Sequence, residues 1–204
     1  MPAHYYSIGE ERAAQDITTL AHYIEKGGKQ FKVIVAIARG GLTVATMLGY
    51  RLGLKIIETV CIISYTNKEQ GELRIIKPVS MDPAFLALLG EGGEHVLVVD
   101  DLADTGATIE LMRKQYPKAT FVAPYAKPNG VGMLDYWVNQ VPQDTWLSFY
   151  WSKDEKDEPV SPAPSVFGDE GPTQEVSFGF PPVKMGSGKQ PYVPPEEQMD
   201  PLAR

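Results

Sequence analysis

The sequence predicts an α/β protein with a mainly parallel central sheet flanked by helices. Short, continuous apolar runs, which are typical of strands buried on both faces, occur at 32–38 and 95–99. Helical patterns alternate with such runs along the first three quarters of the chain, and this alternation indicates βαβ units. Because ligands bind at the carboxyl ends of the strands in such sheets, we expect the functional residues there.

The expected elements follow one another in a regular order. Ser7 and Glu10 have the spacing of a capping box, which predicts a helix running to about Glu25 and ended by Gly27 and Gly28. Helices are also predicted at 42–52, 83–89 and 108–115. Further strands are predicted at 59–64, 72–76 and 120–125, the second of these being more exposed than the others.

Composition excludes several classes of protein. The chain has 204 residues, 43% of them hydrophobic, and a formal net charge of −7, which argues against nucleic acid as the main partner. Cys61 is the single cysteine, so an intramolecular disulfide and a cysteine-based metal cluster are excluded. The apolar runs are far shorter than a membrane span, and no secretory signal is visible. We therefore expect a cytoplasmic protein.

The composition changes after Trp151. Residues 152–204 hold 10 of the 17 prolines, with 10 acidic and 5 basic residues. Such a segment has too little apolar periodicity to build its own core. The sequence therefore predicts a domain at 1–151 and an acidic, proline-rich C-terminal extension at 152–204.

The strongest motif lies at 96–108. An apolar strand ends in the acid pair Asp100 and Asp101, and a short loop with a third carboxylate, Asp104, leads into a helix. A loop that opens a helix offers free backbone N–H groups to a phosphate. Neighbouring carboxylates can accept hydrogen bonds from the vicinal hydroxyls of a ribose and help to hold Mg²⁺. The motif predicts a site for a phosphorylated sugar.

This stretch resembles the phosphoribosyl-pyrophosphate (PRPP) signature of the type I phosphoribosyltransferases, and the wider chain is similar to their bacterial xanthine-guanine branch. The stretches that support the resemblance over roughly residues 30–151 are 38–42, 59–65, 125–130 and 142–146. It implies a type I phosphoribosyltransferase fold with a small hood region at about 127–151. It also implies Mg²⁺ as cofactor, PRPP and a purine base as ligands, and a homo-oligomer, either a dimer or a tetramer.

The resemblance assigns two segments to PRPP. Asp100 and Asp101 are expected to bind the ribose hydroxyls and the Mg²⁺–PRPP complex, with both acids as metal ligands. Arg39, Gly40 and Gly41 are expected to form the pyrophosphate loop. The full expected set is Arg39, Gly40, Gly41, Asp100, Asp101, Ala103, Asp104, Thr105, Gly106, Ala107 and Thr108. The alternatives are an acidic helix cap and an ordinary glycine turn.

The resemblance assigns further residues to the base. Asp104 is the expected general base beside purine N7, with a helix cap as the alternative. Lys127 is expected to donate to the 6-oxygen of the purine, and the alternative is a surface lysine. Trp146 is expected to stack on the base, and the backbone around Trp146 and Leu147 to read its 2-position, the alternative being a tryptophan in the core.

Three further regions stand out in the sequence. Ser64 and Tyr65 precede the polar stretch 66–71, which matches the loop that closes over PRPP but also suits an ordinary hairpin. An added element at 81–93 makes the region 77–95 longer than in the bacterial enzyme. Either residues 154–175 are an insertion near the base pocket, or residues 152–204 together are a partner-binding or disordered tail.

The expected activity is purine salvage: transfer of the 5-phosphoribosyl group from PRPP to N9 of xanthine or guanine, and then of hypoxanthine. A regulatory protein that senses PRPP or a nucleotide is the alternative from another class. The others are a phosphoribosyltransferase for a different base and a non-catalytic assembly subunit. Asp104 and the acidic composition count against a regulator that binds RNA.

Overall fold

The structure is a computed structural model, and it describes residues 4–65 and 72–152. Its largest sheet has five strands in the order β4-β3-β2-β5-β7. These strands are β4 (Glu72–Lys77), β3 (Ile57–Tyr65), β2 (Val33–Ala38), β5 (Val96–Val99) and β7 (Thr120–Val122). Only the β3–β4 pair of this sheet is antiparallel. The predicted α/β fold with a mainly parallel central sheet is confirmed.

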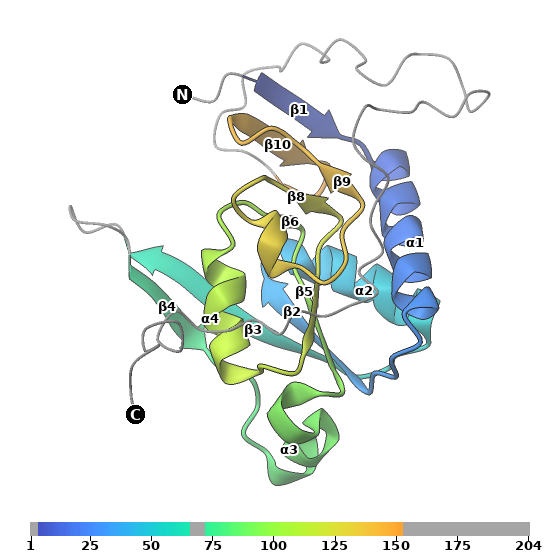
Figure 1. The fold of residues 1–204 in the computed structure, drawn as a ribbon, viewed down its shortest axis with the longest axis vertical. Helices are drawn as coiled ribbons and strands as arrows, with labels where there is room; N and C mark the ends of the chain where they lie inside the picture. Colours follow the sequence, from blue (N-terminus) through green and yellow to red (C-terminus); the bar gives the residue numbers. More distant parts are fainter. Residues whose placement is uncertain (1–3, 66–71, 153–204) are drawn as a thin grey trace, which may run out of the picture. The chain divides into compact units, whose positions relative to one another are not determined.

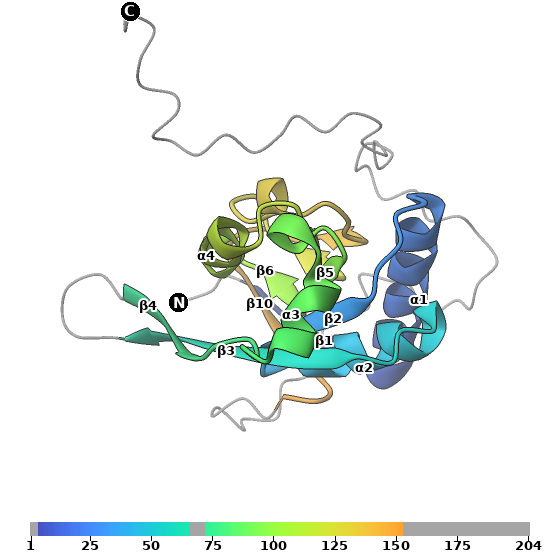
Figure 2. The ribbon, with the colours of Figure 1, turned by 90° about the horizontal axis from the view of Figure 1, so that it is seen from below.

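Helices cover both faces of this sheet. They are α1 (Glu10–Lys26), α2 (Gly40–Leu52), α3 (Pro83–Leu89) and α4 (Ala107–Gln115), with short 3₁₀ turns η1 (Glu91–Gly93) and η2 (Val131–Met133). Figure 1 shows α1 and α4 on opposite sides of β2 and β5, and Figure 2 shows the same arrangement from below.

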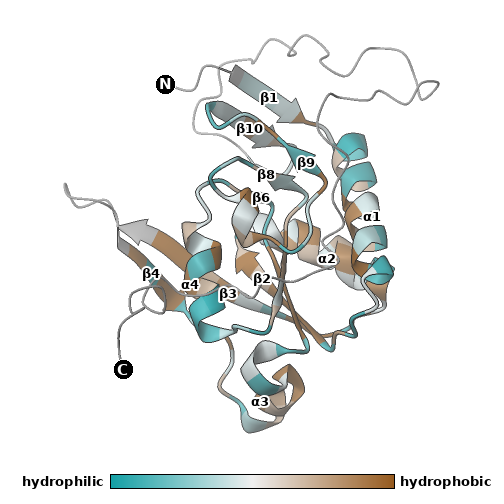
Figure 3. Ribbon diagram, in the orientation of Figure 1, coloured by the Kyte–Doolittle hydropathy of each residue, from teal (hydrophilic) through white to brown (hydrophobic). Residues whose placement is uncertain are grey.

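Alternation along the central strands explains the two covered faces. In β2, Ile34 and Ala36 pack against α1 and α2, whereas Val33 and Val35 belong to the cluster that contains residues of α4. Successive side chains of a strand point to opposite faces, so a strand covered on both must be apolar throughout. Figure 3 accordingly shows β2 as largely hydrophobic, while α1 carries hydrophilic turns.

Short strands lie beyond the carboxyl ends of the central strands, above the arrowhead of β2 in Figure 1. β6 (Leu102–Ala103), β8 (Tyr125–Ala126) and β9 (Asn139–Gln140) form a three-stranded parallel sheet. β1 (His4–Ile8) pairs in parallel with β10 (Thr145–Phe149). The region expected as a hood, 127–151, thus contains β9 and β10 and is joined by the first strand of the chain.

A buried polar cluster ties α1 to these short strands. Asp16 is 5% exposed, and its Oδ2 accepts hydrogen bonds from the Tyr125 hydroxyl at 2.5 Å and from Arg12 Nε at 2.9 Å. Arg12 also donates to Asn139 Oδ1 at 3.1 Å. Because a buried carboxylate needs such partners, the cluster fixes α1 against β8 and β9.

Two predictions about local structure are wrong. Ser7 does not cap a helix: it lies in β1, and α1 begins after Gly9 without a side-chain cap. The strand predicted at 120–125 is two strands, β7 and β8, which belong to different sheets. Pro124 lies between them, and a proline cannot donate the hydrogen bond that a continuous ladder needs.

Within residues 4–65 and 72–152, no helix is long and apolar enough to cross a membrane. The predictions for the stretch 66–71 and for the extension beyond Ser152 lie outside the described residues.

Candidate functional site

The acid pair follows β5, and the glycine loop follows β2, which is the neighbouring parallel strand. The two loops are in direct contact. A Cβ on Gly40 would overlap the carboxylate of Asp101, and a Cβ on Gly41 would overlap the carbonyl oxygen of Val99. At Gly41 the overlap is with backbone, so only glycine permits this approach, whereas a side chain at Gly40 would have to displace the Asp101 carboxylate. The peptide bond before Arg39 is cis, and the Arg39 side chain is exposed at the start of α2.

Burial changes the acidity of the pair. Loss of solvent, and next the negative charge of Asp101, raise the pKa of Asp100 well above its ordinary value. Burial also raises the pKa of Asp101. Asp100 Oδ1 accepts a hydrogen bond from the backbone N–H of Asp101 at 3.0 Å. Holding two ionised carboxyl groups together here therefore costs free energy. A bound cation or hydroxyl donors would reduce that cost.

The described residues contain no group of three or more His, Cys, Asp or Glu side chains placed to hold a metal ion. The acid pair alone offers two carboxylates with oxygen donors. This donor set fits Mg²⁺, which is commonly held by one or two carboxylates while water and substrate phosphates complete its coordination.

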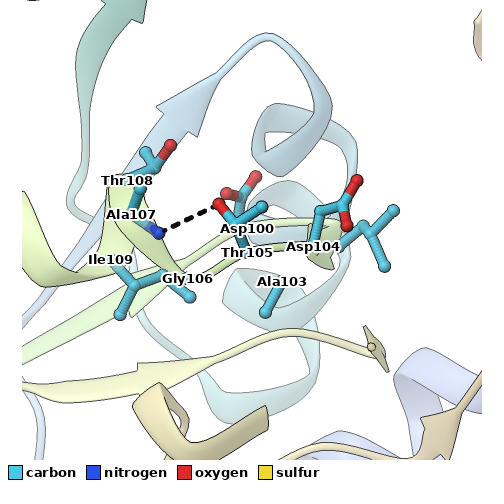
Figure 4. Close-up of a pocket in the computed structure, with 9 residues that line it drawn as sticks. Asp100, Ala103, Asp104, Thr105, Gly106, Ala107, Thr108 and Ile109 are labelled. Carbon is cyan, nitrogen blue, oxygen red and sulfur yellow. Dashed lines mark hydrogen bonds between the residues drawn. The ribbon is translucent and has the colours of Figure 1, made fainter. Parts of the chain in front are cut away.

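A small cavity of about 90 Å³ lies where β6 leads into α4. It is lined by Asp100 and by residues 102–109, and Figure 4 shows how these residues surround it. Gly106, at φ +82°, precedes the first helical residue, Ala107. The Ala107 N–H donates to Thr105 Oγ1 at 3.4 Å, the contact dashed in Figure 4. The cavity thus combines carboxylates, hydroxyls and the start of a helix.

Asp104 is linked to two residues of the following segments. Lys127 Nζ donates to Asp104 Oδ2 at 2.9 Å, and Gln143 Nε2 donates to Asp104 Oδ1 at 2.7 Å. The Lys127 side chain is 7% exposed and that of Asp104 is 52% exposed. A nearly buried ammonium therefore faces a carboxylate that solvent and a ligand can reach.

Strand register explains why Asp104 meets Lys127. In the parallel β6–β8 pair, Ala103 lies opposite Ala126. The next residues along the two strands are Asp104 and Lys127, so they leave the sheet at the same level. The Lys127 N–H also donates to the Ala103 carbonyl oxygen at 2.8 Å, which extends the pairing.

The aromatic candidate is not in the core. Trp146 on β10 is 48% exposed, whereas Leu147 is 7% exposed and packs with Ile8, Tyr125 and Phe149. The Leu147 side chain is thus part of the packing, and a role of its backbone in binding the base stays a prediction. Ser64 and Tyr65 form the end of β3, and the loop that follows them lies outside the described residues.

Residues 5–158 match the model of the phosphoribosyl transferase domain. The chain belongs to this family. The predicted resemblance is confirmed at the level of the family, and the acid pair and Asp104 lie on the segment that carried it.

Solved structures share the fold of this phosphoribosyl transferase. A purine phosphoribosyltransferase from Pyrococcus horikoshii is 24% identical with a TM-score of 0.61, covering 74% of this chain and 95% of that one. A Neisseria gonorrhoeae protein with bound ppGpp is 24% identical with a TM-score of 0.59, covering 76% and 93%. The Helicobacter pylori xanthine-guanine-hypoxanthine phosphoribosyltransferase is 21% identical with a TM-score of 0.58, covering 72% and 94%.

Gln143 is a contact residue that the sequence analysis did not single out. It lies in the stretch 142–146, which supported the resemblance, but a glutamine in a loop carries no pattern of its own. Its nearness to Asp104 depends on how the segment between β9 and β10 returns to the start of α4.

Proposed function

We propose that this phosphoribosyl transferase moves the 5-phosphoribosyl group of PRPP to N9 of a 6-oxopurine. Xanthine and guanine are the preferred bases, followed by hypoxanthine, and the products are the mononucleotide and pyrophosphate. The observation that carries the proposal is the pairing of Asp104 with Lys127 next to the acid pair. An ammonium suits a carbonyl oxygen at position 6, and a carboxylate suits the proton of N7.

PRPP is assigned to the loops after β2 and β5. The cavity at the start of α4 would take the 5-phosphate, with the backbone N–H groups and the hydroxyls of Thr105 and Thr108 as donors. Asp100 and Asp101 would accept hydrogen bonds from the ribose hydroxyls and hold Mg²⁺, which neutralises charge on the pyrophosphate when bound. Arg39 would donate to the pyrophosphate from the other loop.

The chemistry then needs little covalent help. The N9 lone pair forms a bond to the anomeric carbon of PRPP while the bond from that carbon to the pyrophosphate oxygen breaks. The purine loses its N7 proton to the Asp104 carboxylate, and the N–H electron pair stays in the ring. Lys127 holds the 6-oxygen and Trp146 stacks on the ring, so the protein orients both substrates and excludes water.

A base panel tests the proposal. The full-length protein is mixed with Mg²⁺ and PRPP and with xanthine, guanine, hypoxanthine, adenine or nicotinate, and nucleotide and pyrophosphate are measured. We expect turnover with xanthine or guanine and none with adenine. Turnover with nicotinate alone would move the protein to another base class.

The same preparation tests a regulatory role. If no base reacts but the protein binds PRPP or a nucleotide tightly, the enzyme proposal fails and a sensing role replaces it. Guanosine tetraphosphate belongs in this binding set because the Neisseria gonorrhoeae protein holds it. Light scattering on the same sample measures whether the protein forms the expected dimer or tetramer.

A further inference from the structure

The Asp104 carboxylate is reached from two sides, by Lys127 on one oxygen and by Gln143 on the other. Lys127 has an assigned partner in the proposed reaction, the 6-oxygen of the purine. Gln143 has none. We propose that Gln143 is a positioning residue, which holds the Asp104 carboxylate in place for the N7 proton while Lys127 serves the base. This inference rests on the proposed function.

Hydrogen bonds at both polar atoms fix the orientation of the Gln143 amide. Its Oε1 accepts a hydrogen bond from the backbone N–H of Asn129 at 3.0 Å, and a backbone N–H can only donate. Its Nε2 donates to Asp104 Oδ1, and an ionised carboxylate can only accept. Both partners therefore require the same orientation, so the amide is preorganised toward Asp104.

Asp104 needs such support because packing does not hold it. Its side chain is 52% exposed. An exposed aspartate samples several rotamers, and each sampled rotamer that points away from the base lowers the fraction of productive complexes. Hydrogen bonds from Lys127 and Gln143 select one rotamer. When Lys127 also donates to the purine, Gln143 is the contact on Asp104 that the ligand does not share.

The position of Gln143 in the chain links this contact to the base. Gln143 lies three residues before Trp146, in the segment that leads from β9 into β10. The segment that carries the expected stacking ring therefore also carries the anchor of the expected general base. The segment that places Trp146 against a bound purine would therefore also position the Asp104 carboxylate through Gln143.

The test uses the full-length protein and three variants: Gln143→Ala, the near-isosteric Gln143→Glu, and Gln115→Ala as control. Gln115 is an exposed glutamine at the end of α4. We expect Gln143→Ala to lower kcat with guanine or xanthine by about tenfold or more, with the KM for PRPP changed less than about twofold. The control should retain wild-type kinetics, and thermal melting confirms that each variant is folded.

Two readouts separate positioning from a general structural role. Gln143→Glu places a second carboxylate against Asp104, so the acidic limb of the kcat–pH profile should move to higher pH. In an Asp104→Asn background, Gln143→Ala should have little further effect on kcat, because both changes act on the same group. A merely structural residue would leave the pH profile unchanged and lower kcat in both backgrounds.

Normal kcat in Gln143→Ala and an unmoved pH profile in Gln143→Glu, with an active wild type, would overturn this inference alone. If the wild-type protein transfers phosphoribose to no base at all, the proposed function falls, and this inference falls with it.

Discussion

The carboxylate of Asp101 fills the space in which a side chain at Gly40 would lie. Asp101 follows β5, and Gly40 is the first residue of α2 after the neighbouring strand β2, so their contact packs the start of α2 against the acid pair. In the proposed reaction these two segments hold opposite ends of the same bond, the ribose on one side and the pyrophosphate on the other.

Gly40→Ala tests this packing. The new methyl group must push Asp101 or the start of α2 aside, so we expect kcat/KM for PRPP to fall by about 10²-fold. Thermal melting should show destabilisation of about 1–3 kcal/mol, as for other overpacked sites. The matched control is Gly9→Ala, because a Cβ there meets nothing within 4 Å. Equal kinetics for the two variants would contradict the assignment of the loop to PRPP.

Asp104→Asn removes the proposed base and keeps its shape. We expect kcat with guanine or xanthine to fall by about 10²–10⁴-fold, which is the usual range for general base catalysis. Steady-state kinetics with saturating PRPP measure it. Asp144→Asn is the control, since Asp144 is an exposed aspartate in the same loop as Gln143. Full kcat in Asp104→Asn would remove Asp104 from the chemistry.

Lys127→Met removes the ammonium proposed for the 6-oxygen. A hydrogen bond from a charged group is worth roughly 1.5–3 kcal/mol, so we expect kcat/KM for guanine to fall by about 10–100-fold. Adenine, which lacks the 6-oxygen, should remain a non-substrate, so the effect is measured as the fall in kcat/KM for guanine from the wild-type protein to the variant. Lys114→Met is the control, because the Lys114 side chain is 59% exposed and pairs with Glu110 on the same helix. An unchanged kcat/KM for guanine in Lys127→Met would show that another group binds the oxygen at position 6.

Asp100→Asn should stabilise the ligand-free protein while lowering its activity. Burial and the neighbouring charge of Asp101 disfavour the ionised carboxyl. A neutral amide avoids both costs, so we expect a gain of about 0.5–2 kcal/mol. Melting without PRPP or metal measures the gain, which amounts to roughly 2–4 °C per kcal/mol for a protein of this size. A lower melting temperature would mean that the carboxylate is needed for the fold.

Tyr125→Phe tests the cluster that joins α1 to the short strands. Burial, and next the charge of Asp16, raise the pKa of Tyr125 far above its ordinary value. The unfolded chain loses this proton near pH 10 while the folded protein keeps it, so the folded state loses stability as the pH rises above about 10. Tyr125→Phe should be less stable by about 1 kcal/mol at neutral pH. Its melting temperature should fall less steeply at alkaline pH, and an equal slope would contradict this account.

The sequence predicts the central strands because their signal is local. The runs that became β2 and β5 are apolar at every position, and burial on both faces requires this pattern. The acid pair and Asp104 could be selected as candidates because they come directly after the run that forms β5. β1 carries no comparable signal, since its partner Thr145–Phe149 lies at the other end of the described chain. Only that partner decides that its residues form a strand.

The contacts of the candidate site divide in the same way. The resemblance selected Lys127 and Asp104 separately, but their ion pair follows from the register of β6 with β8. Gln143 reaches Asp104 through the return of a loop, which depends on tertiary structure. Motifs can thus select candidate residues one at a time, whereas the partner of each residue depends on pairings between distant segments.

The parallel pairing of Tyr5 with Trp146 sets an order of events during synthesis. β1 is synthesised before its partner β10, and almost the whole described chain separates the two strands. β2 and β5 can pair much earlier, since less chain separates them. We therefore expect the central sheet to form before β1 pairs with β10, the strand that carries Trp146. We expect a tag fused before β1 to slow the pairing of β1 with β10. Recovery of activity on refolding should then be slower than for the untagged protein.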